Sequence, residues 1–278
     1  MDSSTPAPLS VREVRNFRTI VYTHFREHGR DLPWRRTKDP YAILVSEIML
    51  QQTQVARVVG KFEEFMRRFP DVETLASAPL RDVLVVWQGL GYNRRALALK
   101  KLAEAVVAEL GGDIPRDMQS LTKLPGIGKA TAQAILAFAY NQPVVFIETN
   151  IRSVFIYHFF SGRTIVLDSE LIPLVALTVD AENPRRWYNA LMDYGVWLKK
   201  QHANPGRSSA HYRKQAPFEG SDRHVRGAIL KALATREAYT EEELTIVLPF
   251  EPKLVRKNMA QLVREGLIKR NKDHVCIA

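Results

Sequence analysis

Helical periodicity runs from Val11 to about Trp197, and it predicts a body made of α-helices. In the first segment, Val14, Phe17 and Val21 recur at the spacing that places apolar side chains on one face of a helix. Prolines at positions 40, 70, 79 and 115 separate the segments that follow. No sustained strand-like alternation precedes residue 240, and no repeat of roughly 20–50 residues is visible. We therefore expect an all-α fold rather than a solenoid or a sheet protein.

Charge and cysteine content narrow the classes of partner and cofactor. The formal net charge is +10, which favours a polyanionic partner, either nucleic acid or an anionic membrane surface. The single cysteine, Cys276, excludes an internal disulfide, a cysteine zinc finger and a cysteine-held iron–sulfur cluster within one chain. No apolar stretch is long enough to cross a membrane, and the first residues lack the features of a secretory signal. We expect a soluble, cytosolic, basic protein.

A change in composition after residue 200 predicts a second domain. Residues 1–10 are polar and rich in Ser and Pro, which indicates a flexible tail. Residues 201–221 are polar and contain Pro, Gly and Ser, so we expect a linker between a domain at 11–200 and one at 222–278.

The predicted second domain has the element order of a winged helix-turn-helix. It shows three helical segments, the second with Thr240 and Glu243 as a capping box and the third ending at Gly266. A small hairpin at 267–269 and 274–277 follows, in which Cys276 is expected to be a core residue.

The segment LPGIG, at residues 124–128, joins two helical patterns. Gly126 and Gly128 would allow a tight turn that exposes backbone N–H groups at the start of a helix, where a phosphate can bind. Lys129 follows directly and favours that function. A simple turn between two helices is the alternative interpretation.

Two carboxylates occur among apolar neighbours, Glu47 in ILVSEIMLQQT and Glu148 in VVFIETN. A carboxyl group in an apolar wall can act as an acid near neutral pH, and a second, ionised one can stabilise a cationic sugar. The alternative is that each is a helix cap or an ion-paired core residue. The sequence spacing alone does not bring the two together.

Five blocks then identify a family resemblance. They are LPWRRTKDPYAILVSEIMLQQTQV, FPDVETLASAP, VWQGLGYNRRALAL, LPGIGKATAQAIL and FIETNIRSV. In this order they resemble the helix-hairpin-helix (HhH-GPD) DNA glycosylases, and most of all the MutY adenine-mismatch family. The resemblance implies a six-helix lobe, about residues 35–142, inserted in a helical lobe made of residues 11–34 and 143–200. The active site of that family lies between the lobes.

The resemblance assigns roles to particular residues. Glu47 matches the general acid that protonates the adenine ring. Glu148 matches the carboxylate that supports the cationic sugar, and Asn150 matches a polar residue beside it. Gln51 and Tyr92 match residues that wedge into the duplex where the base has been flipped. The alternative for Gln51 is an ordinary polar residue of a helix, and the alternative for Tyr92 is a packed aromatic residue of a loop.

The hairpin carries a further implied site. Gly126, Gly128 and Lys129 would contact DNA. The backbone carbonyls that match a cation site beside a DNA phosphate are those of Thr122, Leu124 and Ile127.

Several positions depart from the family pattern. The stretch from Lys199 to Gln215 lacks the four cysteines that the family usually carries there, so no iron–sulfur cluster and no other cofactor is expected. Ala130 stands where the endonuclease III relatives have a Schiff-base lysine, which favours a monofunctional enzyme. Glu148 replaces an aspartate, and its extra methylene moves the charge by roughly 1.5 Å, a displacement that can cost about 100-fold in rate. The winged-helix-like domain takes the place of the domain that reads 8-oxoguanine.

That domain carries basic residues on its third helix and hairpin. Arg256, Lys257 and Arg270 suit contacts with a duplex backbone. The alternatives are a solvated charged face or a protein-interaction module.

The leading hypothesis is a monofunctional DNA glycosylase of base excision repair, expected to be a cytoplasmic, nucleoid-associated monomer that does not act on membranes. It would flip a mispaired or damaged base out of double-stranded DNA and hydrolyse its glycosidic bond, with adenine in a mismatch as the first substrate. One alternative substrate is thymine or uracil opposite guanine, or a modified base. A second alternative is a catalytically weak protein that binds distorted duplex.

Overall fold

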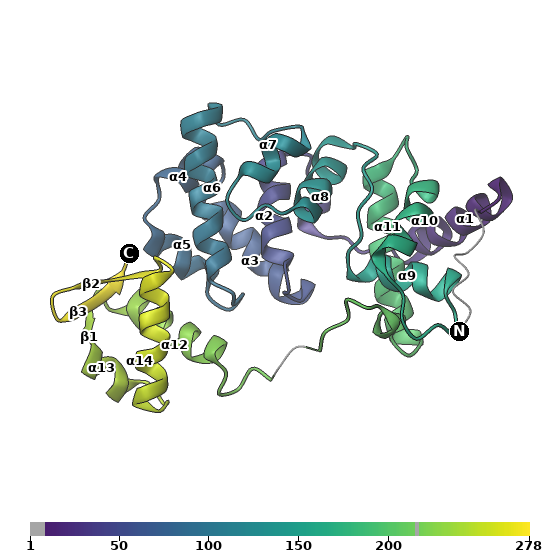
Figure 1. Cartoon of the computed structure of the whole chain (residues 1–278). Coiled ribbons are helices and arrows are strands. Elements are labelled where there is room, and N and C mark those ends of the chain that lie inside the picture. Colours follow the sequence, from purple (N-terminus) through teal and green to yellow (C-terminus); the bar gives the residue numbers. More distant parts are fainter. Residues whose placement is uncertain (1–8, 215–216) are drawn as a thin grey trace. The chain divides into compact units, whose positions relative to one another are not determined.

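The computed structural model describes residues 9–214 and 217–278, and it is mostly helical with a small sheet near the end of the chain (Figure 1). The expected all-α class is confirmed. Residues 1–8 of the expected tail and residues 215–216 of the expected linker lie outside the described residues. None of the described helices has the length and apolar character needed to cross a bilayer.

The described residues form two compact units. The first, here called the Glu148 unit, comprises the residues up to Ile43 together with Arg116–Gln119 and Gly128–Lys214. The second, the Glu47 unit, comprises Leu44–Pro115, Ser120–Ile127 and the chain from residue 217 onward. The C-terminal domain therefore clusters with the middle of the chain.

The Glu148 unit is built from helices of both early and late sequence. They are α1 (Val11–His28), η1 (Pro33–Arg35), α8 (Lys129–Tyr140), α9 (Thr149–Phe159), α10 (Asp168–Thr178), α11 (Pro184–Gln201) and η2 (Pro205–Ser208). Helices α2 (Pro40–Leu50) and α7 (Met118–Lys123) begin in this unit and end in the other. The core of the Glu148 unit is aromatic, and the Phe17 ring meets the rings of Phe155 and Trp187 edge to face. Helix α8 buries Ala134, Ala137 and Phe138 in this same core.

A buried ion-pair cluster fixes the segment after α1 against α11. The Asp193 carboxylate accepts hydrogen bonds from the backbone N–H and Nε of Arg30, at 2.8 and 2.7 Å. Arg35 adds two parallel bonds from its guanidinium, both at 2.8 Å. Burial opposes ionisation of Asp193, but these donors outweigh it and hold the pKa of that carboxyl below its usual range.

The Glu47 unit contains α3 (Val55–Arg68), α4 (Val72–Ser77), α5 (Leu80–Trp87) and α6 (Arg94–Leu110). The C-terminal domain adds α12 (Asp222–Thr235), β1 (Tyr239–Thr240), α13 (Glu241–Val247), α14 (Pro252–Arg264), β2 (Ile268–Asn271) and β3 (His274–Ile277). Helix α12 packs on α5, and Arg81 of α5 donates to the carbonyl of Ala234 at 3.0 Å.

The C-terminal domain confirms most of its expected elements. Thr240 and Glu243 form the predicted capping box at the start of α13. The hairpin forms as β2 and β3, and the unexpected two-residue strand β1 adds a third strand in the order β1-β3-β2. The expectation that Cys276 is a core residue is wrong: Val275 and Ile277 are the buried residues of β3, and alternation leaves Cys276 partly exposed.

Candidate active site

Glu148 caps the N-terminus of α9 with its own side chain. Its Oε1 accepts hydrogen bonds from the backbone N–H groups of Asn150, at 2.7 Å, and Ile151, at 2.9 Å. Its Oε2 accepts a third from Asn150 Nδ2 at 3.1 Å. A carboxylate is favoured there because the first N–H groups of a helix lack intrahelical acceptors and the helix dipole is positive at that end. The helix-cap interpretation of Glu148 is confirmed, and the cap holds the carboxylate in one orientation.

Lys199 of α11 extends this arrangement. Its Nζ donates to Asn150 Oδ1 at 2.7 Å. An ammonium only donates and a carboxylate only accepts, so the Asn150 amide has its oxygen toward Lys199 and its nitrogen toward Glu148. Sequence reasoning missed Lys199 as a site residue.

Glu148 and Lys199 each offset part of the effect that burial has on the pKa of the other. Burial raises the pKa of Glu148, and the hydrogen bond from Ile151 N–H, the Lys199 charge and the bonds from Asn150 oppose that rise. Burial lowers the pKa of Lys199, and Glu148 opposes that change. Arg152 also disfavours the Lys199 charge, although its own guanidinium is paired with Asp168 at 2.8 and 2.7 Å. Each member of the pair therefore favours the ionised form of the other.

Gly195 allows α11 to approach the start of α9 closely enough for this contact. A Cβ at Gly195 would lie 2.5 Å from the backbone oxygen of Asn150 and 2.8 Å from its Cβ. Gly195 and Lys199 are four residues apart, so they lie on the same face of α11. A glycine one turn before a lysine in an otherwise bulky helix is the sequence signal that could have pointed to this contact.

The stretch after α11 is held against the Glu148 unit by its own backbone. Val166 N donates to Ser208 O at 2.8 Å, and Ala210 N donates to Val166 O at 2.9 Å. A Cβ at Gly206 would lie 2.8 Å from Ser153 Oγ, so the loop packs closely on α9. The stretch offers no thiolate, and the residues present do not fit an iron–sulfur cluster. No group of three or more His, Cys, Asp or Glu side chains suited to a metal occurs among the described residues.

Glu47 lies on α2, where it is half-buried between the buried residues Ser46 and Ile48. The helix is apolar on nearly all sides, as the sequence indicated. Glu47 and Glu148 belong to different units, so their joint action on one nucleotide stays a prediction.

Arg95 organises the end of α2 and the loop that carries Tyr92. Its Nη1 donates to the carbonyls of Ile48, Met49 and Gln51 at 2.8, 2.8 and 2.6 Å. Its Nη2 donates to Thr53 Oγ1 and to the carbonyls of residues 90 and 91. Burial lowers the pKa of Arg95 to about 10, which leaves it charged at neutral pH. A cation at the C-terminus of a helix satisfies carbonyls that lack intrahelical donors. This partly buried arginine, which sequence reasoning missed, therefore positions the expected wedge residues.

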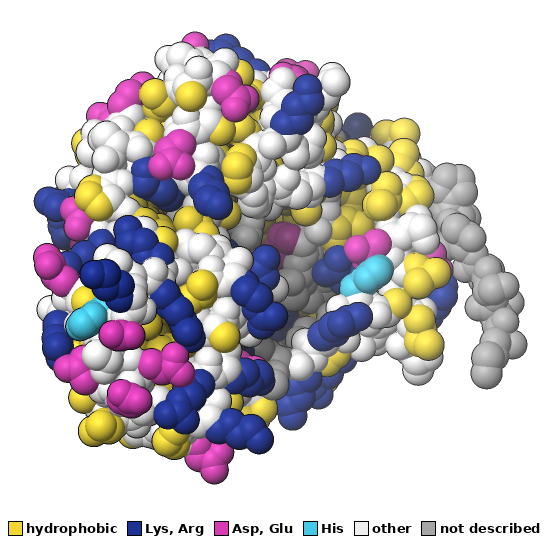
Figure 2. All heavy atoms as spheres, turned by 60° about the vertical axis from the view of Figure 1, so that its left-hand side comes forward, with side chains coloured by type: hydrophobic (Ala, Val, Ile, Leu, Met, Phe, Trp, Pro, Cys, Tyr) yellow, Lys and Arg dark blue, Asp and Glu magenta, His cyan; other side chains and the backbone are white. Residues whose placement is uncertain are grey.

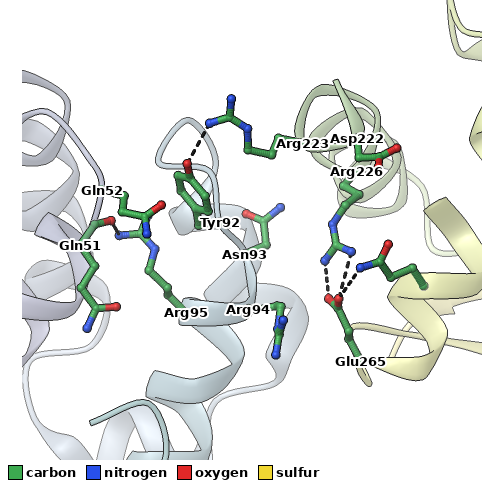
Figure 3. A pocket seen from close by; sticks show the side chains of 11 residues that line it. Gln51, Gln52, Tyr92, Asn93, Arg94, Arg95, Asp222, Arg223, Arg226 and Glu265 are labelled. Carbon is green, nitrogen blue, oxygen red and sulfur yellow. Dashed lines mark hydrogen bonds and ion pairs between the residues drawn. The ribbon is translucent and has the colours of Figure 1, made fainter. Parts of the chain in front are cut away.

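The expected wedge residues line a cavity of about 440 Å³. Figure 3 shows Gln51 and Tyr92 on one side and Arg223 and Arg226 of α12 on the other. Arg223 donates to the Tyr92 hydroxyl at 2.8 Å, and the guanidiniums of Arg95 and Arg223 both lie 5.5 Å from the Tyr92 ring centroid. Tyr92 also has a backbone φ of +49°, which residues other than glycine adopt rarely and which the surrounding contacts must hold in place.

The helix-hairpin-helix turn joins α7 to α8. Gly126 has a φ of +79°, and a Cβ there would lie 2.9 Å from the Ala98 Cβ, so this position requires glycine. Gly128 precedes α8 with an extended backbone, and Lys129 is the exposed first residue of that helix. The Leu124 carbonyl accepts a hydrogen bond from Ile127 N at 3.2 Å, which closes the turn.

The basic residues of the C-terminal domain form ion pairs with its acidic residues. Glu241 pairs with Arg256 at 3.3 Å and with Arg270 at 2.9 Å, and Lys257 pairs with Asp222 at 3.0 Å. Figure 2 shows Lys and Arg side chains interspersed with Asp and Glu side chains on this side of the molecule. The three cations are more than half exposed, and ion pairs this exposed contribute little free energy to folding.

Comparisons with known proteins identify the family of this chain. Residues 45–245 match the HhH-GPD superfamily base excision DNA repair proteins. The adenine DNA glycosylase of Mycobacterium tuberculosis is 33% identical over 92% of this chain and 91% of its own length, so the match includes part of the C-terminal domain. The human adenine DNA glycosylase is 36% identical over 67% of this chain and 36% of its own length.

Solved structures of DNA repair enzymes have a similar fold. A thermostable thymine-DNA glycosylase is 28% identical with a TM-score of 0.60, over 66% of this chain and 87% of that chain. A trapped endonuclease III–DNA complex, at 19% identity and a TM-score of 0.54, has a similar fold over 75% of this chain and 91% of that chain. The expected helix-hairpin-helix glycosylase fold is thereby confirmed. This chain belongs to the HhH-GPD superfamily of base excision DNA repair proteins.

Proposed function

We propose that this protein is a monofunctional adenine DNA glycosylase that acts on mismatched duplex. The observation that carries the substrate is the match to an adenine DNA glycosylase over nine-tenths of both chains. The chemistry is supported by the oriented carboxylate at the start of α9, because such a group can stabilise positive charge that develops on a sugar.

In the proposed reaction, Glu47 donates a proton to the adenine ring as the glycosidic bond breaks. The base then leaves as a neutral molecule, which lowers the barrier relative to loss of an anion. Glu148 acts ionised, and its charge stabilises the cationic sugar until water adds to it and passes a proton to Glu47, which restores that acid. The hydrogen bonds from Asn150 and Ile151 keep that carboxylate oriented while burial strengthens its electrostatic effect.

The target base must leave the stack before either group can act. We propose that Gln51 and Tyr92 enter the duplex at that point, and that Arg95 and Arg223 hold Tyr92 ready for it. Gly126, Gly128 and Lys129 would contact a backbone phosphate at the hairpin, with a cation held by the carbonyls of residues 122, 124 and 127. The enzyme would act as a monomer on chromosomal DNA in the cytoplasm.

The C-terminal domain is proposed to add phosphate contacts. Arg256, Lys257 and Arg270 would exchange Glu241 and Asp222 for DNA, and each phosphate contact would make binding more dependent on salt.

The absence of a lyase step is also part of the proposal. Ala130 offers no amine where the endonuclease III relatives carry their Schiff-base lysine, and Lys199 donates to Asn150. Abasic product should therefore remain intact until alkali is added.

A second substrate has one specific observation in its favour. The chain is similar to a solved thymine-DNA glycosylase at a TM-score of 0.60. The deciding experiment measures single-turnover excision from duplexes with adenine opposite 8-oxoguanine, adenine opposite guanine, and thymine or uracil opposite guanine. We expect adenine to be released from the first two. Release of thymine or uracil alone would favour the second substrate, and binding without any excision would favour a catalytically weak DNA-binding protein.

A further inference from the structure

One amine beside the candidate catalytic carboxylate has no role in the reaction described above. Lys199 is partly buried on α11, and its Nζ reaches Asn150 Oδ1 at 2.7 Å. Its neighbour Lys200 is exposed to solvent. A buried lysine loses hydration and side-chain entropy, so its position here requires a compensating contact.

The hydrogen bond to Asn150 offsets the cost of burying Lys199 and links the lysine to Glu148 through one side chain. Asn150 connects the two, because its Oδ1 accepts from Lys199 and its Nδ2 donates to Glu148 Oε2 at 3.1 Å. The carboxylate and the ammonium both select this orientation of the amide, because the reverse one would set oxygen against carboxylate and NH2 against ammonium. The lysine therefore strengthens the orientation in which the amide donates to Glu148.

We propose that Lys199 is a positioning residue that holds the Asn150 amide and, through it, places a positive charge one side chain away from the Glu148 carboxylate. This inference rests on the proposed function of Glu148. It gives the stretch that lacks cysteines a role of its own: the first position of that stretch supplies a cation to the candidate active site.

The neighbouring basic side chains, Arg152 and His211, both lie beside the Asp168 carboxylate. Arg152 is engaged by Asp168 through two hydrogen bonds, and His211 lies 3.9 Å from the same carboxylate. Of these groups, Lys199 is the one whose charge lowers the pKa of Glu148. Arg152 disfavours the Lys199 charge, and Glu148 favours it.

The first test measures the Glu148 carboxyl directly, without any substrate. The full chain is labelled with ¹³C at glutamate side chains, and the Glu148 resonance is assigned by its loss in Glu148→Gln. In Lys199→Met the Glu148 pKa should rise further, because an opposing positive charge is gone. In Lys199→Arg it should stay close to the parent value, and in the matched control Lys200→Met it should not change. An unchanged Glu148 pKa in Lys199→Met would overturn the proposal.

The second test measures the single-turnover rate of base release against pH at saturating enzyme. Lys199→Met should reduce the rate about 10- to 100-fold with little change in duplex affinity, since a misoriented catalytic group costs about that much. The rising limb of its pH profile should move to higher pH, and Lys199→Arg should recover most of the rate. Equal losses in Lys199→Met and Lys200→Met would contradict a specific role.

Two outcomes separate this inference from the proposed function. If the parent releases no base from any duplex, the proposed function fails, while the Glu148 titration still decides whether Lys199 acts on that carboxyl. If borohydride traps a covalent DNA adduct with the parent and not with Lys199→Met, the lysine is a nucleophile, and the positioning role is refuted.

Discussion

Gly195 lies where α11 packs against the start of α9, and its replacement tests whether that close packing matters for catalysis. In Gly195→Ala the new Cβ would lie 2.5 Å from the Asn150 backbone oxygen and 2.9 Å from its carbonyl carbon. Ordinary contacts of this kind are about 1 Å longer, so one of the two helices must move by roughly that distance. Alanine raises helix propensity by about 0.5–1 kcal/mol, but overpacking costs about 1–3 kcal/mol, so a net loss of stability is expected.

The catalytic effect of Gly195→Ala should exceed its effect on stability. A displacement of about 1 Å at Asn150 also moves the Glu148 carboxylate that this residue holds, and we expect a loss of about 100-fold in single-turnover rate. The assay compares adenine release by folded variants, with folding checked by thermal unfolding. The control is Gly60→Ala, an exposed helical position where nothing lies within 4 Å of the new Cβ, which should be neutral or slightly stabilising. A rate within a few-fold of the parent would refute the reasoning.

Three further predictions concern stability, lyase activity and the C-terminal domain. Asp193→Asn should destabilise the fold by about 3–5 kcal/mol, because it leaves buried arginine charge unpaired. Asp31→Asn should lower the melting temperature far less, because its ion pair is exposed to solvent; thermal unfolding measures both. Since the folded pKa of Asp193 is lowered, its stabilisation should be complete above its ordinary pKa of 3.8 and lost as the pH falls through the lower folded value. Because Ala130 offers no amine, borohydride should trap little enzyme–DNA adduct, and strand breaks should require alkali. Efficient trapping would show that an amine of the protein bonds covalently to the abasic sugar. Arg223→Met should weaken binding to a duplex with an abasic analogue by about 10-fold, because it removes the hydrogen bond and the cation from Tyr92, and unchanged affinity would exclude that role.

Local rules predicted the elements whose causes are local. The capping box of Thr240 and Glu243 follows from side chains three residues apart, and the hairpin follows from a turn between two short strands. Strand β1 was missed because two residues give no alternation to recognise, and it exists only through its pairing with β3. For Glu148 the helix cap was one of the alternative interpretations, and the structure confirms it.

Those local rules could not predict contacts between segments that are far apart in the sequence. Lys199 meets Asn150 across a separation of 49 residues, and Arg223 meets Tyr92 across 131. Arg95 was an unremarkable member of a basic pair in the sequence, and its role depends on the carbonyls that the end of α2 presents to it. In each case the polar group is selected by packing that brings two helices together, which periodicity alone does not specify.

The central claim is that this protein releases adenine with Glu47 as the acid. The most direct measurement is the single-turnover rate of adenine release from a duplex with adenine opposite 8-oxoguanine, for the parent and for Glu47→Gln, at saturating enzyme. We predict release by the parent and a loss of at least about 100-fold in Glu47→Gln with nearly unchanged duplex affinity, because the variant keeps the shape and lacks the proton. Adenine release by Glu47→Gln within a few-fold of the parent would contradict the account, as would a parent that binds this duplex and releases no adenine.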